Sequence, residues 1–191
     1  MTNMTSQTKL IPPHGGYKKL LSYQSATVVY DFTGEFCKRY MSYGSNGTYT
    51  RTHDQMVQAA RSGRQNIVEG SQASGTSKKT EIKLVNVARA SQEELLTDYE
   101  DFLRQRGLAS WGKDDPRAKA VRALAYTTNR SYETYRTYMT NAENAANCAI
   151  CLIHQTNYLL DKQLAALEKE FLEKGGFTER LYNARREARG Y

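Results

Sequence analysis

Residues 70–79 read GSQASGTSKK and separate two stretches with helical periodicity. The spacing of Gly70 and Gly75 fits the first part of the phosphate-binding loop pattern G-x-x-x-x-G-K-[ST], but Thr76 stands where that pattern requires lysine. Such a loop also follows a β-strand, whereas the preceding HDQMVQAARSGRQNIVEG (53–70) has helical spacing. We therefore expect an interhelical connection, with Gly70 ending one helix and Ser77 capping the next.

Working outward, apolar residues recur at helical spacing along most of the chain, and no alternating strand pattern of useful length is present. The helical segments are 17–42, 53–70, 77–106, 116–140 and about 145–174. These predict an all-α protein: an up-down four-helix bundle over residues 17–140, then a C-terminal extension, 141–191, with an additional long helix and a basic tail. Residues 1–16 are polar, contain Pro12 and Pro13, and are predicted to be a flexible lead-in.

The chain carries a net charge of +7 and has a pI of about 9.3, which favours an anionic partner. The charge is uneven: residues 51–90 and 104–136 are basic, whereas residues 91–103 hold five acids and no base. The three cysteines indicate a reducing compartment rather than a disulfide scaffold. No apolar run resembles a signal peptide or approaches the roughly 18 residues of a membrane span, so a cytoplasmic protein without membrane contact is expected.

Few side chains are spaced for catalysis or metal binding. Cys148, Cys151 and His154 form C-x-x-C-x-x-H, but successive members drift around a helix and no second cluster supplies further zinc ligands. Neither His53 nor His154 belongs to a Glu-x-x-His pair of the kind that di-metal bundles use. No nucleophile motif is present either. We expect no enzyme activity, no metal and no cofactor.

Tyrosines and arginines are interleaved in the segment 116–140. Such a stripe can stack on bases and neutralise phosphates, but tyrosine at helical spacing is also ordinary core material. Both interpretations stay open for Tyr126, Tyr132, Tyr135 and Tyr138, with Arg122, Arg130 and Arg136.

The stretch RQNIVEGSQASGTSKKTEIKLVNVARASQEELLTDYEDFLRQRGL (64–108) resembles a family of bacterial four-helix-bundle proteins. That family includes the 23S rRNA intervening-sequence protein and the accessory variability determinant (Avd) of diversity-generating retroelements. The matching features are an I-x-E-G helix end, an S-K-K helix start, an N-x-A step and an E-L-x-T stretch, with Thr80 where many relatives have glutamate. Residues 141–191 are similar to a C-terminal extension found on a subset of the family. The matching residues are Ile67, Glu69, Gly70, Ser77, Lys78, Lys79, Asn86, Ala88, Glu94, Leu95 and Thr97.

The resemblance implies a ring-like homopentamer without catalysis that binds RNA or DNA and partners a reverse transcriptase. Because a helix start already favours anions, we expect the basic residues around 77–89 to contact phosphates. The predicted nucleic-acid-binding residues are Arg61, Arg64, Lys78, Lys79, Lys83 and Arg89. The alternative is a structural scaffold without nucleic acid, in which the stripe Leu160, Leu164, Leu167 and Phe171 of the C-terminal helix docks on a protein partner.

Overall fold

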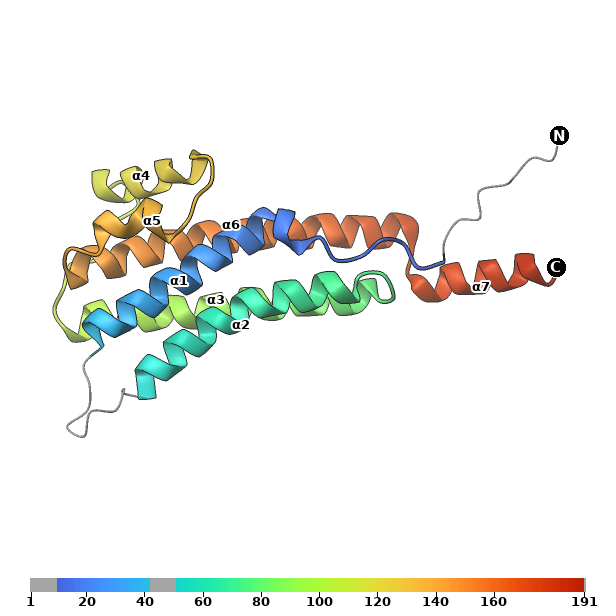
Figure 1. The fold of residues 1–191 in the computed structure, drawn as a ribbon, viewed down its shortest axis with the longest axis horizontal. Helices are drawn as coiled ribbons and strands as arrows, with labels where there is room; N and C mark the ends of the chain where they lie inside the picture. Colours follow the sequence, from blue (N-terminus) through green and yellow to red (C-terminus); the bar gives the residue numbers. More distant parts are fainter. Residues whose placement is uncertain (1–9, 42–50, 191) are drawn as a thin grey trace.

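The computed structural model describes residues 10–41 and 51–190, and these residues form only helices and connecting segments. The predicted residues 1–9 of the lead-in lie outside the described residues. Four long helices run side by side: α1 (Leu21–Tyr40), α2 (Arg51–Ala73), α3 (Lys78–Gln105) and α6 (Ala142–Lys174). Each packs antiparallel against two of the others, so the chain is an all-α, up-down four-helix bundle (Figure 1).

The fourth helix of the bundle is not the one that the sequence predicted. We expected a single helix over residues 116–140, with the C-terminal helix as an addition; instead α6 packs between α1 and α3 and completes the bundle. Its stripe therefore faces the core rather than a partner: Leu160 and Leu167 are buried, and Leu164 packs against the same cluster. The expected docking face of the C-terminal helix is thus largely occupied by the chain itself.

Residues 116–140 form four short pieces that lie beside α6 and α1 near one end of the bundle (Figure 1). Asp115 and Pro116 begin the first of these helices, as predicted, because the Asp115 carboxylate accepts a hydrogen bond from the Arg117 N–H. The helical path then breaks at Asn129, whose φ is 57°. The pieces are α4 (Pro116–Ala123), η2 (Leu124–Tyr126), α5 (Tyr132–Tyr135) and η3 (Arg136–Tyr138).

The connection 70–79 is an interhelical turn, as predicted, but it begins later than expected. Gly70 lies inside α2 and is not a cap; a Cβ there would lie 3.3 Å from the Glu81 carbonyl oxygen, so the glycine permits α2 and α3 to approach closely. Ser77 is the predicted N-cap, and its hydroxyl accepts a hydrogen bond from the Thr80 N–H at 3.1 Å. No strand precedes this turn, because residues 51–73 are helical.

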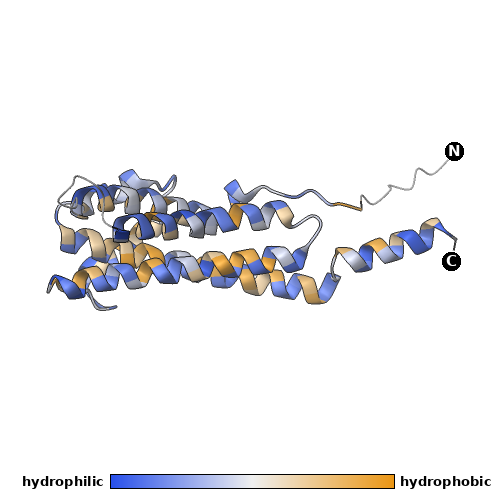
Figure 2. Ribbon diagram, turned by 90° about the horizontal axis from the view of Figure 1, so that it is seen from below, coloured by the Kyte–Doolittle hydropathy of each residue, from blue (hydrophilic) through white to orange (hydrophobic). Residues whose placement is uncertain are grey.

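The core divides into two clusters along the bundle. The larger cluster contains Phe36, which makes edge-to-face contacts with Tyr99 and Phe102 at centroid distances of 4.8 and 4.9 Å. The smaller cluster lies nearer the turn between α2 and α3 and includes Ile67, Val85 and Leu160. Figure 2 shows the apolar residues following the inner sides of the bundle helices. A last helix, α7 (Phe177–Ala188), extends beyond the bundle (Figures 1 and 2) and buries none of its residues.

Candidate nucleic-acid interface

Three of the predicted nucleic-acid-binding residues are exposed cations. Lys79 and Lys83 lie one turn apart near the start of α3, and Arg61 lies on α2. Within the described part of the chain, none of the three has a carboxylate within ion-pairing distance. These side chains are therefore available to a polyanion.

Lys78 and Arg89 instead join α3 to α6. The Lys78 Nζ lies 3.0 Å from Glu81 Oε2 and 3.1 Å from Glu170 Oε2. Burial lowers the pKa of Lys78, but the hydrogen bonds and charges of the two carboxylates outweigh this and raise it overall. Arg89 contacts Glu93 at 2.5 Å and Asp161 at 3.2 Å. Carboxylates of α3 and α6 therefore already balance both positive charges, so Lys78 and Arg89 are not free cations.

Arg64 has a third environment, at the interface between α1 and α2. Its guanidinium lies 4.2 Å from the centroid of the Tyr30 ring, a cation–π contact. Burial raises the pKa of the nearby Asp31 carboxyl, and the Arg64 charge opposes that rise. The predicted residues therefore do not form one surface. Arg61 is also distant from Lys83 along the bundle axis. Its neighbour Ser62 forms a hydrogen bond with Ser91 of α3 at 3.0 Å. Ser91 lies eight residues, or about 12 Å, beyond Lys83 on the same helix.

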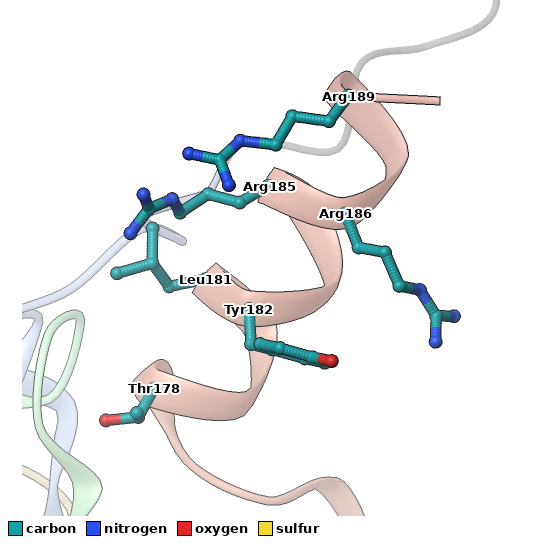
Figure 3. Close-up of a pocket in the computed structure, with 6 residues that line it drawn as sticks. All are labelled: Thr178, Leu181, Tyr182, Arg185, Arg186 and Arg189. Carbon is teal, nitrogen blue, oxygen red and sulfur yellow. The ribbon is translucent and has the colours of Figure 1, made fainter. Parts of the chain in front are cut away.

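A further basic surface lies on α7, and its residues were not among the predicted site residues. This helix follows Gly175, whose φ of 65° suits glycine, and begins where Glu179 accepts a hydrogen bond from the Gly176 N–H. An open groove of about 550 Å³ on its surface is lined by Thr178, Leu181, Tyr182, Arg185, Arg186 and Arg189 (Figure 3). The sequence does carry the signal, because FTERLYNARREAR places these arginines at helical spacing.

The start of α7 is close to the turn between α2 and α3. The Arg180 guanidinium lies 3.5 Å from the Gly75 carbonyl oxygen. In Figure 1, α7 continues from this end of the bundle, opposite the end that carries α4. The exposed Lys79 and the arginines of α7 thus belong to the same end of the molecule.

The other candidate motifs are distributed between core and surface. Cys148 and Cys151 are buried whereas His154 is exposed, so the three side chains do not converge on one point. Burial raises the pKa of both thiols. No group of three potential metal ligands occurs among the described residues. The tyrosine–arginine stripe is likewise divided, since Tyr135 is fully buried and Tyr126 is 92 % exposed.

Two further findings concern the chain as a whole. In the described ranges, no helix combines the length and apolar character that crossing a membrane requires. Comparison with protein families, curated proteins and solved structures finds no match to this chain.

Proposed function

We propose that this protein is a non-enzymatic nucleic-acid-binding accessory protein that acts in the cytoplasm as a ring-like homo-oligomer. The observation that carries the proposal is the group of exposed cations at one end of the bundle. Lys79 and Lys83 have no ion-pair partner among the described residues, and α7 adds Arg185, Arg186 and Arg189. Together with the net charge of +7, this end favours a polyanion.

The helix geometry adds to the effect of these charges. Lys79 occupies the first turn of α3, where unsatisfied N–H groups and the helix dipole also favour an anion. A phosphate at this turn would therefore meet a lysine side chain and a positive helix end together. This arrangement contacts the backbone of a nucleic acid and reads no base sequence.

Binding without catalysis is consistent with the chemistry of the buried groups. Burial raises the pKa of Cys37 to about 12, and an efficient cysteine nucleophile needs the opposite shift. The homopentamer and the reverse-transcriptase partner follow from the resemblance to Avd-type proteins. Light scattering of the purified chain measures the number of subunits in the oligomer. Co-purification with a reverse transcriptase from the same genome tests the proposed partner.

A salt series tests nucleic-acid binding directly. Fluorescence anisotropy with a labelled RNA and DNA should show an affinity whose logarithm falls linearly with the logarithm of salt concentration. The Lys79→Gln/Lys83→Gln variant should reduce that slope by about 1.8 on duplex DNA. The matched control, Lys113→Gln/Lys119→Gln, removes the same charge near α4 at the opposite end and should leave the slope unchanged. The absence of binding at low salt would refute the proposed function.

A protein scaffold is the second candidate, and one observation still favours it. Although Leu160 and Leu167 of the predicted stripe are buried, Leu172, which lies outside that stripe near the end of α6, is 77 % exposed. A partner that covered Leu172 would remove its apolar side chain from water, which is favourable. Leu172→Glu should then abolish partner capture or shrink the oligomer while leaving nucleic-acid affinity per chain unchanged.

A further inference from the structure

The arginines of α7 and one exposed tyrosine share a single face of the helix. At 100° per residue, the residues that line the groove fall within an arc of about 140°. They form two rows with a spacing of four residues, which places their members one turn apart. The rows are Leu181, Arg185 and Arg189, and Thr178, Tyr182 and Arg186. Figure 3 shows Arg185 and Arg189 extended on one side of the helix, with Tyr182 and Arg186 on the adjoining side.

The acidic residues of α7 do not neutralise this face. Glu187 lies on the opposite side of the helix, about 170° from the centre of the groove. Glu179 lies beside the face, but its carboxylate accepts the hydrogen bond from the Gly176 N–H that begins the helix. Among the described residues, no carboxylate pairs with Arg185, Arg186 or Arg189. The face is therefore cationic and carries an unpartnered aromatic ring.

Tyr182 is open to solvent. The residue is 64 % exposed, and no residue of α7 is buried against the bundle. Arg185 and Arg186 follow it at three and four residues, the spacing at which side chains on a helix are neighbours. An aromatic ring flanked by guanidinium groups matches the stacking and phosphate contacts that proteins use for unpaired nucleotides.

We infer that the groove of α7 is a binding site for single-stranded nucleic acid, in which Tyr182 stacks on an unpaired base. Arg185, Arg186 and Arg189 contact the phosphates on either side of that base. A single strand is favoured over a duplex because the bases of a duplex are stacked on one another and their faces are closed to Tyr182. This inference rests on the proposed function. It adds a class of ligand, single-stranded nucleic acid, and a site on α7 that does not include Lys79 and Lys83.

The test compares the affinities of full-length variants for a labelled 12-nucleotide uridine RNA, the matching thymidine DNA and a 12-base-pair duplex. Tyr182→Ala should weaken binding to either single strand roughly 5- to 100-fold and leave duplex binding nearly unchanged. Tyr182→Phe keeps the ring and should bind like the wild type. The matched control is Tyr158→Ala, because Tyr158 is 60 % exposed and also lies beside a cation, Lys162, at 5.5 Å.

The role of the groove arginines is tested separately, by the salt dependence of single-strand binding. Replacing Arg185 and Arg189 by glutamine should reduce the slope on the single strand by about 1.4, whereas Arg180→Gln, on the opposite face, should not. Equal losses on single strand and duplex for Tyr182→Ala, or no loss on either, would overturn the inference while leaving the proposed function intact. If the wild type binds none of the three probes at low salt, the proposed function itself fails. Different losses on the RNA and the DNA would identify which strand the site prefers.

Discussion

Two glycines inside helices of the bundle have opposite surroundings. A Cβ at Gly63 would clash with the side-chain amide of Gln92, whereas a Cβ at Gly34 would meet no atom within 4 Å. Gln92 is fully buried, so it has little room to move away. Gly63→Ala should therefore destabilise the fold by about 1–3 kcal/mol through overpacking. Gly34→Ala should stabilise it by up to about 1 kcal/mol, because alanine favours the helix.

Urea denaturation of the two variants measures both effects, and opposite signs are the expected result. The side-chain amide of Gln92 adds a further test, because neither of its polar atoms has a hydrogen-bond partner in the described structure. In the double variant Gly63→Ala/Gln92→Ala, much of the Gly63→Ala penalty should disappear. If both glycine variants gain stability equally, α2 and α3 leave enough space between Gly63 and Gln92 for a methyl group.

The buried thiols should make the stability of the protein depend on alkaline pH. Burial, with smaller effects of Asp98 and Asp54, raises the pKa of Cys37 to about 12, while an unfolded thiol titrates near 8.5. The thiol therefore contributes its stability fully below about pH 8.5 and loses it as the pH rises toward 12. Between pH 8 and 9.5, Cys37 should account for a loss of about 1 kcal/mol in unfolding free energy. Cys37→Ala should lower that difference by about the same amount; an unaltered pH dependence would contradict the assignment.

At the scale of whole elements, Lys78 holds α3 and α6 together. Glu81 is only 7 % exposed, and burial raises its pKa while Lys78 opposes that rise. Lys78→Gln leaves this carboxylate without its partner and should cost about 1–3 kcal/mol at pH 7. The cost should shrink as the pH falls into the acidic range, because burial raises the pKa of Glu81 and lets this carboxylate take up a proton and lose its charge. Lys79→Gln, at the exposed neighbouring position, should change stability by less than about 0.5 kcal/mol.

Helical periodicity predicted the long helices well, but it predicted poorly which helices pack against one another. It identified α1, α2, α3 and α6, because each has an apolar stripe, and α3 and α6 also begin at polar caps, Ser77 and Asn141. It could not show that α6 closes the bundle, since a stripe indicates that a face is buried but not which helix covers it. The break within 116–140 had a local signal, TTNRS (127–131), whose threonines, Asn129 and Ser131 favour turns and caps over a continuous helix.

In the candidate interface, the sequence likewise could not show which charged residues have ion-pair partners. Sequence identifies Lys78, Lys79 and Lys83 as equivalent cations, but whether a carboxylate of α6 reaches one of them depends on how the two helices are aligned. Glu170 lies far from Lys78 in the sequence and only 3.1 Å away in the structure. In contrast, α7 buries none of its residues, and no carboxylate among the described residues pairs with Arg185, Arg186 or Arg189, so its basic face could have been derived from helical spacing alone.

The four-helix bundle buries the core of the molecule, whereas α7 buries none of its residues, and truncation tests whether α7 carries the proposed binding surface. Removing residues 175–191 deletes α7, which buries no side chain, so the midpoint of urea unfolding should stay within error of the wild type. The same truncation removes the groove arginines and should lower the slope of single-strand binding against salt by about 2. Removing residues 159–191 also deletes Leu160 and Leu167, which are buried in the smaller core cluster, and should destabilise the bundle by several kcal/mol. A shorter chain that lacks α7 yet retains full single-strand affinity would place the binding surface on the bundle itself, around Lys79 and Lys83.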